Sequence, residues 1–484
     1  MCGIVAVTGY RQALPLLFEG LEKLEYRGYD SAGIAVMDSE NKKIISYKSE
    51  GKLKNLKNKL DKKIISGSLG IGHTRWATHG KPVVRNAHPH FDSNEQVAVV
   101  QNGIIENYLE LKTRLESEGV VFTSETDTEV IPHLVQRELN NLSKLNLENS
   151  GSTLLIAVRN VITDLEGAFA LAVIWSGSPD SLVVARNQAP LIIGLGEGEF
   201  ICASDTPAIT NITNTILPME DEEIALLTPL GIEIFNSENE RQYRNPISLK
   251  LSEQIVDKKH FKHYMLKEIY DQPQIAKNWI KQFLGEDISS FTSINYSFDI
   301  KFLQNIDQIQ ILACGTSRHA ALIGSYLLEQ YAGISTNVFY ASEFRYFPPP
   351  LSPNILTIGV TQSGETADTL AALNMEIKRR QSSGKESYQP NLIAITNRKD
   401  SSIARLIPNV IDISAGIEIG VAATKTFFGQ LLSFYGLAIT FAQIRKSKTR
   451  EEIDQMISNL IKVPSLLEDL IISHNKISEE LAHK

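Results

Sequence analysis

The sequence predicts an α+β layered sandwich followed by a doubly wound α/β domain with a parallel sheet. With 484 residues, the chain is longer than a single hydrophobic core usually serves, which favours two or more domains. Up to about residue 240, short β-rich runs cluster toward both ends and helical patterns lie between them. After about residue 270, apolar runs alternate with helical stretches, which is typical of a parallel sheet with helices on both faces.

In the first domain, short apolar runs predict strands and a period near 3.6 residues predicts helices. The expected strands cover residues 4–7, 33–37, 44–47, 69–72, 97–100, 168–175, 182–185 and 191–201. The expected helices cover residues 12–24, 107–118, 129–139 and 152–165. The Lys-rich stretch 52–63 is interpreted as the solvated face of a short helix. Strand-on-strand packing favours a layered sandwich over residues 2–240.

A polar stretch around Pro246 separates the two patterns, and we expect residues 241–275 to form a linker. The second domain is expected over residues 276–445, and residues 446–484 are a polar, helix-prone tail with no strand after it. The expected strands of the second domain cover residues 309–313, 337–340, 355–360, 392–396 and 410–413.

Composition and charge exclude several classes of protein. An apolar fraction of 43% with 21% charged residues is ordinary for a globular protein. The formal charge of −8, with no basic stripe, argues against nucleic acid as a partner. No signal pattern opens the chain, and the longest apolar run, 431–442, is too short to cross a bilayer, so we expect a buried helix and no membrane. Three cysteines cannot form a disulfide framework in so long a chain, which indicates a reducing, cytoplasmic location.

Cys2 is the first candidate for chemistry. After removal of Met1 its thiol would lie beside a free α-amine, whose pKa of about 8 leaves it partly neutral and able to act as a base. The alternative is that Cys2 is a small apolar residue that opens a strand. The motifs further along the chain decide between the two interpretations.

A nucleophile that attacks a carboxamide needs a cation for the substrate carboxylate, an anion for its amine and donors for the oxyanion. Arg75 follows a strand and could grip a carboxylate, or could be an arginine at a surface strand end. Asn102 and Gly103 offer a side-chain amide and the next backbone N–H, although Asn-Gly is more often a hairpin turn. Asp127 could pair with an ammonium or cap a helix, and we expect it to be a ligand. Arg27 could support the loop of the nucleophile or lie in a simple turn.

Two loops of small residues each connect a strand to a helix in the second domain. Residues 314–317 read Cys-Gly-Thr-Ser, and residues 361–366 read Thr-Gln-Ser-Gly-Glu-Thr. Their N–H groups, hydroxyls and helix ends suit a phosphate, although Ser and Thr there are also ordinary N-caps. Two such loops at the carboxyl ends of parallel strands favour a ligand site. Neither loop matches the dinucleotide fingerprint or the Walker sequence, so we expect a sugar phosphate and no NAD or ATP.

A metal site and a second nucleophile are not expected. His79, His88 and His90 match no strong ligand spacing, and no pair of cysteines joins them, so structural histidines are the better interpretation. Cys314 is interpreted as a structural thiol near the sugar site, because no base is visible beside it.

The motifs of the first domain, in their order along the chain, resemble the class II glutamine amidotransferases, an N-terminal-nucleophile (Ntn) hydrolase type. The motifs are Cys-Gly-Ile-Val at 2–5, Tyr-Arg-Gly-Tyr-Asp-Ser-Ala-Gly at 26–33, Gly-His-Thr-Arg-Trp-Ala-Thr-His-Gly at 72–80, Gln-Asn-Gly-Ile-Ile-Glu-Asn-Tyr at 101–108 and Ser-Glu-Thr-Asp-Thr-Glu at 124–129. The resemblance implies an αββα Ntn-hydrolase sandwich that hydrolyses glutamine through a thioester and releases ammonia.

The same resemblance implies roles for single residues. Cys2 would be the nucleophile, Asn102 and Gly103 would stabilise the oxyanion, and Arg27 would support the site. Five residues would bind glutamine or belong to the loop that closes over it: Arg75, Trp76, Thr78, His79 and Asp127.

The loops of the second domain, with Gly-Ile-Glu-Ile-Gly-Val-Ala-Ala-Thr-Lys-Thr at 416–426, resemble the sugar-isomerase (SIS) module. The resemblance implies sugar-phosphate contacts from Thr316, Ser317, Thr361, Gln362, Ser363, Thr366 and Val421. An amidotransferase domain followed by a SIS module resembles the glutamine–fructose-6-phosphate aminotransferase (isomerizing) family, and residues 262–273 match that family's junction. The resemblance implies conversion of glutamine and fructose 6-phosphate into glutamate and glucosamine 6-phosphate, the start of amino-sugar supply, by a homodimer without a cofactor.

That family continues into a second SIS module, which supplies the base and other residues of the sugar reaction. This sequence ends at Lys484 without a second series of strands and loops, so we expect a fragment or a truncated chain, and whether it completes the synthesis stays open. One alternative is another class II amidotransferase, such as the phosphoribosyl-diphosphate type, whose acidic signature the second half lacks. Another is a sugar-phosphate sensor with a degenerate first domain, against which the intact Cys2 and Arg75 argue.

Overall fold

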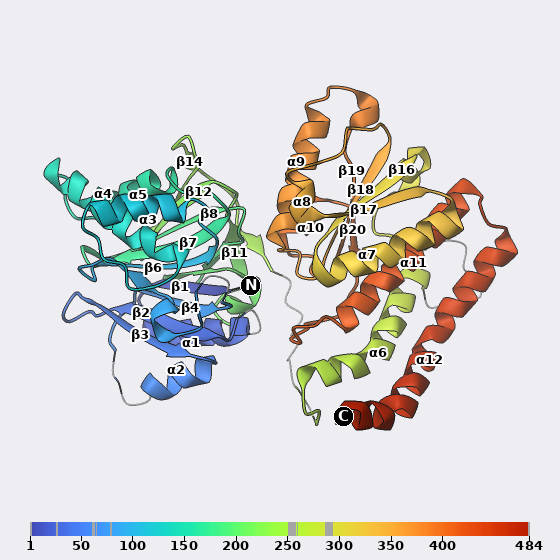
Figure 1. Cartoon of the computed structure of the whole chain (residues 1–484), viewed down its shortest axis with the longest axis horizontal. Helices are drawn as coiled ribbons and strands as arrows, with labels where there is room; N and C mark the ends of the chain where they lie inside the picture. The colour runs from blue at the N-terminus through green and yellow to red at the C-terminus, as the bar shows by residue number, and fades with distance from the viewer. Residues whose placement is uncertain are drawn as a thin grey trace. The chain divides into compact units, whose positions relative to one another are not determined.

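A computed structural model describes residues 2–25, 28–60, 63, 65–77, 80–249, 258, 260–285 and 294–482. The chain folds as two compact units that meet in sequence at residues 252 and 253 (Figure 1). Each unit has hydrophobic clusters of its own, so each is described by itself. Residues 241–275, expected as a linker, contain the last two strands of the first unit at their start and part of a helix of the second unit at their end.

Two antiparallel sheets form the first unit. In the described residues one sheet has eight strands in the order β15-β11-β9-β10-β1-β4-β2-β3, and the other has seven in the order β14-β13-β12-β8-β7-β6-β5. The strands of the eight-stranded sheet are β1 (Gly3–Gly9), β2 (Ser31–Met37), β3 (Ile44–Glu50), β4 (Gly70–Arg75), β9 (Ile192–Leu195), β10 (Glu199–Ala203), β11 (Thr215–Pro218) and β15 (Ile247–Ser248). Those of the seven-stranded sheet are β5 (His90–Phe91), β6 (Val97–Gly103), β7 (Phe169–Trp175), β8 (Ser178–Asn187), β12 (Glu223–Thr228), β13 (Gly231–Phe235) and β14 (Arg241–Gln242).

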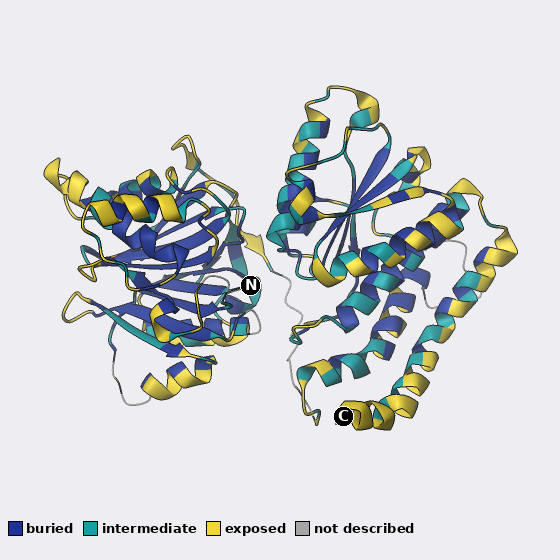
Figure 2. Ribbon diagram, in the orientation of Figure 1, coloured by how far each residue is buried: buried dark blue, intermediate teal, exposed yellow. Residues whose placement is uncertain are grey.

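Alternation along the strands builds four layers in this unit. Ile4 and Ala6 of β1 face the second sheet, whereas Val5 and Val7 face the outer helices, as the period of two in a strand requires. The helices α1 (Ala13–Leu24) and α2 (Leu53–Leu60) cover the first sheet, and α3 (Tyr108–Ser117), α4 (Val130–Lys144) and α5 (Gly151–Ile162) cover the second. Figure 2 shows the strands buried and the outer sides of the helices exposed. The expected αββα sandwich is confirmed.

A parallel sheet lies at the centre of the second unit. Its strands, in the order β17-β16-β18-β19-β20, are all parallel to their neighbours. Their bounds are β16 (Gln308–Ala313), β17 (Ser335–Tyr340), β18 (Ile355–Thr361), β19 (Asn391–Thr396) and β20 (Val410–Asp412). The chain moves to one side of β16 for β17 and to the other side for β18, which makes the space between β16 and β18 the topological switch point. The expected doubly wound domain is confirmed.

Helices cover both faces of this sheet (Figure 1). On one face lie α6 (Tyr264–Leu284), α7 (Gly315–Leu327), α11 (Lys425–Arg445) and α12 (Arg450–Ala482). On the other lie α8 (Ala341–Phe344), α9 (Ala367–Gln381) and α10 (Ser402–Leu406). In the described residues, α11 is the one helix long and apolar enough to span a bilayer, but 67% of its most apolar window is buried inside the unit. The expected buried helix is therefore confirmed.

One predicted strand of the first unit is wrong in extent. Residues 191–201 form two strands, β9 and β10, instead of one, because the chain turns between them where Gly198 has a φ of +70°. The N–H of Gly196 donates to Glu199 O at 3.0 Å and closes this turn. The strands from β11 onward in this unit were not predicted. β11 and β15 have two to four residues and pair with distant parts of the chain, whereas β12, β13 and β14 pair in sequence as local hairpins.

Candidate functional site

Cys2 lies at the start of β1, beside the end of β4. The antiparallel register pairs Gly3 with Thr74, so Cys2 is next to the residues that follow β4. The backbone N–H of Trp76 donates to Cys2 Sγ at 3.2 Å, and Sγ lies 3.5 Å from Trp76 O. The sulfur thus accepts a hydrogen bond from the N–H of Trp76, and the thiol donates one to the carbonyl of the same residue. The half-buried thiol is thus held at a defined position rather than packed as a simple core residue.

Arg75 is the last residue of β4, and its side chain is buried. Its guanidinium donates to Gly80 O at 3.2 Å and to Lys81 O at 3.3 Å. Burial lowers the pKa of Arg75, while the charges of Cys2 and Asp127 raise it. The predicted cation therefore lies within electrostatic reach of both the thiol and the predicted anion, and not at an exposed strand end.

Asp127 opens a short 3-10 helix, Asp127–Glu129, and is buried. Its carboxylate accepts a hydrogen bond from the N–H of Ile105 at 2.8 Å, which ties it to the loop after β6. Thr126 occupies the N-cap position of that helix and makes no side-chain capping bond, so Asp127 is not its cap. The carboxylate is positioned by tertiary contacts.

Asn102 and Gly103 end β6 and pair with β7, so they do not form a two-residue hairpin turn. The Nδ2 group of Asn102 donates to Cys2 O at 3.2 Å, and its Oδ1 lies 3.0 Å from His73 Nε2. Because Nδ2 is the donor toward Cys2, Oδ1 must accept, and His73 therefore carries its proton on Nε2. Burial lowers the pKa of His73 to about 3, so this imidazole is neutral.

Gly103 is needed at its position for two reasons. Its φ of +103° lies in the region that favours glycine, and a Cβ there would lie 1.9 Å from Ala168 O. The N–H of the next residue, Ile104, donates to the same carbonyl at 3.0 Å, so the end of β6 lies close to the backbone just before β7.

In the second unit, the two small-residue loops follow β16 and β18, which are adjacent parallel strands. Thr316 and Ser317 lie in the first turn of α7, and the Nε2 of Gln430 on α11 donates to Ser317 Oγ at 2.9 Å. Neither Cys314, the N-cap of α7, nor Thr366, the N-cap of α9, makes a side-chain capping bond. Of these two residues only Thr366 has a hydroxyl, and it contacts the Thr361 hydroxyl instead of capping α9.

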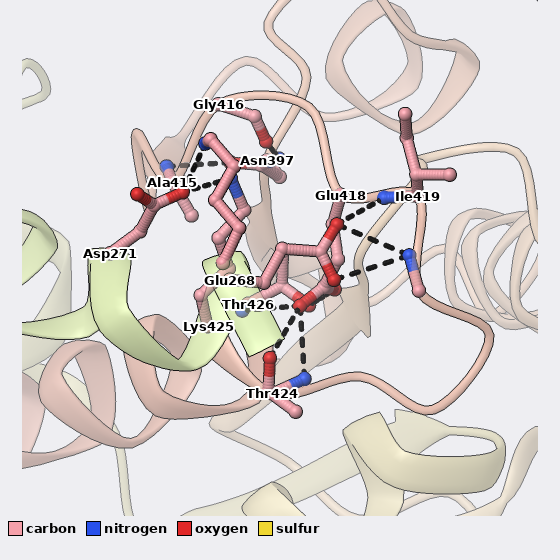
Figure 3. Close-up of polar contacts among 12 residues, drawn as sticks. Glu268, Asp271, Asn397, Ala415, Gly416, Glu418, Ile419, Thr424, Lys425 and Thr426 are labelled. Atoms are coloured by element: carbon pink, nitrogen blue, oxygen red, sulfur yellow. Dashed lines mark hydrogen bonds and ion pairs between the residues drawn. The ribbon is translucent and has the colours of Figure 1, made fainter. Parts of the chain in front are cut away.

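The loop after β18 is ordered by its own hydroxyls. Thr361 Oγ1 and Thr366 Oγ1 lie 2.7 Å apart, and Ser363 Oγ accepts from the N–H of Glu365 at 3.1 Å. Gln362 O accepts a hydrogen bond from the N–H of Asn397 at 3.2 Å. The side chain of Asn397 holds the following loop, because its Oδ1 accepts from Ala415 N–H at 2.8 Å and its Nδ2 donates to Gly416 O at 2.6 Å (Figure 3). Val421, 64% exposed, lies on that loop.

Comparisons with known proteins cover both units. A profile of the glutamine amidotransferase domain matches residues 73–211, and a profile of the SIS domain matches residues 302–440. The glutamine–fructose-6-phosphate aminotransferase (isomerizing) of Thermosynechococcus vestitus is 51% identical over 100% of this chain and 76% of its own length. The protein of the same name from Nostoc sp. is 53% identical over the same shares. The chain belongs to this aminotransferase family.

The chain is therefore a glutamine amidotransferase with a SIS domain, and it spans about three quarters of the length of these aminotransferases. Among solved structures, the C-terminal domain of the glucosamine-fructose-6-phosphate aminotransferase from Francisella tularensis aligns with 46% of this chain and 60% of its own, at 32% identity and a TM-score of 0.40. The family is not the phosphoribosyl-diphosphate type that the sequence left open.

Three predicted residues, Arg27, Thr78 and His79, lie outside the described residues. Among the residues that are described, no group of three His, Cys, Asp or Glu side chains could hold a metal ion. His88 is buried and stacks on His73 with 4.1 Å between ring centroids, and burial lowers its pKa well below the usual value. Burial also raises the pKa of the Cys314 thiol, which keeps it protonated.

The sequence analysis did not single out two residues that lie beside the candidate glutamine site. Asp30 accepts a hydrogen bond from the N–H of Ala77 at 2.8 Å and so fixes the chain just after Trp76. His73 holds the amide of Asn102. Both lie inside motifs that carried the resemblance, but only the fold shows which atoms they contact.

Proposed function

We propose that the chain hydrolyses glutamine at Cys2 and binds fructose 6-phosphate at the loops after β16 and β18, in the service of glucosamine 6-phosphate synthesis. One observation carries the proposal: Cys2 contacts Trp76 and Asn102, which come from two other motifs 74 and 100 residues away. A cysteine that only opened a strand would have no need of an N–H directed at its sulfur and a buried side-chain amide donating to its backbone carbonyl. A cytoplasmic, dimeric protein is part of the same proposal.

The chemistry follows from the groups around Cys2. With Met1 removed, the α-amine accepts the thiol proton, and sulfur attacks the carboxamide carbon of glutamine. Asn102 Nδ2 and the N–H of Gly103 stabilise the oxyanion. The C–N bond then breaks, ammonia leaves with the proton from the amine, and water hydrolyses the thioester to glutamate. Arg75 and Asp127 bind the carboxylate and the ammonium of glutamine.

Residues near the nucleophile complete this proposed site. We assign Trp76, Thr78 and His79 to the loop that covers glutamine and Arg27 to the support of the nucleophile. The T-shaped contact of Trp76 with Tyr29, with 5.4 Å between centroids, supports a fixed position for the tryptophan ring.

At the second site, hydroxyl and backbone donors suit the phosphate of a hexose phosphate. We assign the phosphate contacts to Thr316, Ser317, Thr361, Gln362, Ser363 and Thr366. Val421 would line the sugar. Support comes from the location of both loops at the switch point of the sheet, where ligands of open α/β sheets bind.

The test is glutamate release from glutamine by the 484-residue chain, with and without fructose 6-phosphate, after mass spectrometry has shown the loss of Met1. We expect release that rises with the sugar phosphate, and no release from Cys2→Ala. Cys202→Ala, which removes a buried thiol of the same unit, is the matched control and should retain activity. Activity in Cys2→Ala, or none in the processed chain, would overturn the proposal. Assay of glucosamine 6-phosphate separates complete synthesis from glutaminase activity alone.

A further inference from the structure

The loop between β20 and α11, residues 413–424, carries Val421 and has no regular secondary structure. Hydrogen bonds from side chains, and not the backbone ladder of a sheet, fix its position (Figure 3). Asn397 binds its beginning, as described above. Glu418 binds its end, since Oε1 accepts from the N–H groups of Thr424 at 2.9 Å and Thr426 at 3.3 Å, and Oε2 accepts from the Thr426 hydroxyl.

A residue from outside the loop holds its middle. Glu268 lies on α6, 151 residues before Ile419, and only 2% of it is exposed. Its carboxylate accepts from Ile419 N–H at 2.6 Å and from Gly420 N–H at 3.1 and 3.2 Å. A Cβ at Gly420 would lie 2.5 Å from Glu268 Oε2, so glycine is what allows this approach. The next residue is Val421.

An ion pair joins α6 to α11, the helix that follows the loop. Lys425, the first residue of α11, is 4% exposed, and its Nζ lies 3.6 Å from a carboxylate oxygen of Asp271 on α6. Lys267 pairs with the same oxygen at 2.7 Å. Both ends of the segment from Ile419 to Lys425 are therefore attached to α6, and residues 421–423 form the tip between the two attachments.

We propose that Glu268 is a positioning residue of the sugar-phosphate site: it fixes the backbone at 419–420 so that Val421 meets the sugar. The inference rests on the proposed function, because it needs the SIS unit to bind a hexose phosphate. In the second unit, α6 is the first described helix after the segment that joins the units, so a shift of α6 acts directly on this loop. The contact with Glu268 thus connects the loop 413–424 to the start of the second unit.

The test measures binding of fructose 6-phosphate and of inorganic phosphate to the full chain by calorimetry. Glu268→Gln should bind fructose 6-phosphate about tenfold more weakly, as expected when hydrogen bonds to a buried charged acceptor lose their charge. Inorganic phosphate should bind no more weakly than to the unmutated chain, because it needs only the loops after β16 and β18. Removal of a negative charge would by itself favour any anion, so weaker binding of the sugar phosphate alone indicates loop position.

Two further variants make the test specific. Gly420→Ala attacks the same contact from the loop side, so its effect and that of Glu268→Gln should not add in the double variant. Glu376→Gln removes another buried carboxylate of this unit, which binds Gln310 and Arg380, and should leave both affinities unchanged.

Each outcome has one meaning. Equal weakening of both ligands in Glu268→Gln would show general damage and overturn the inference, and so would no weakening of either. If the unmutated chain binds neither ligand, the proposed function of the second unit fails first. If the unmutated chain binds both ligands and Glu268→Gln binds both equally well, the proposed function stands and the inference alone is wrong.

Discussion

The hydrogen bond between His73 and Asn102 predicts how much activity depends on the orientation of one amide. In His73→Leu, Asn102 Oδ1 loses a donor at 3.0 Å, and the amide can rotate so that its oxygen replaces Nδ2 on the side that faces the Cys2 backbone. A hydrogen bond between neutral groups makes a net contribution of about 0.5–1.5 kcal/mol, so the productive orientation of the amide should become roughly 3–10 times less populated. Loss of the amide in Asn102→Ala should cost about 10²–10³ in kcat, as expected for an oxyanion donor.

The assay is the steady-state rate of glutamate release, with kcat and KM determined separately. We expect kcat to fall roughly 3–10-fold in His73→Leu with KM nearly unchanged. His73→Gln should retain more activity because it keeps an N–H donor. Asn107→Ala removes an asparagine side chain on the surface of the same unit and serves as the control for Asn102→Ala. If His73→Leu lowers kcat by the same factor in the Asn102→Ala background, His73 does not act through Asn102 and the reasoning is refuted.

Two stability predictions follow from the same unit. Because the folded pKa of His73 is about 3 and its ordinary value is 6.5, the unfolded chain binds more protons as pH falls between these values, so this residue should cost ~1.4 kcal/mol of unfolding free energy per pH unit. Urea unfolding at several pH values should show a shallower dependence in His73→Gln; equal slopes would contradict it. Gly103→Ala should lower Tm more than Gly119→Ala, since both have positive φ but only Gly103 lacks room for a Cβ. Equal losses would assign the cost to φ alone.

Local patterns predict the central strands of both units well. The run at 4–7 becomes β1 and the five apolar runs after residue 300 become β16 to β20. The strands β1, β16, β18 and β19 are buried on two sides and need a continuous apolar segment, whereas β17 and β20 are the edges of their sheet and are only partly buried. The same rule fails for residues 191–201, where two adjacent strands of a hairpin have similar composition and only the turn at Gly198 separates them.

The candidate sites are predictable to the level of the groups that meet a ligand, and less so for the groups behind them. Asn102 stands out because an amide beside a glycine after a strand suggests donors for an oxyanion. His73 and Glu268 carry no such signal. A buried histidine is ordinary, and a glutamate in a helix is usually on the surface, so their roles depend on contacts across 29 and 151 residues.

Both candidate sites put their proposed ligand-binding groups where regular strand structure ends, and this explains why such supports are needed. A loop without ladder hydrogen bonds has unsatisfied N–H groups and several accessible conformations. A buried side chain from elsewhere removes both problems, as Glu268 does for Ile419 and Gly420. Gln430 on α11 acts on a side chain instead, because its Nε2 donates to the Ser317 hydroxyl in the first turn of α7. Because each support pairs one buried acceptor or donor with one loop, loss of a support should change the position of a ligand-binding group more than the stability of the whole unit.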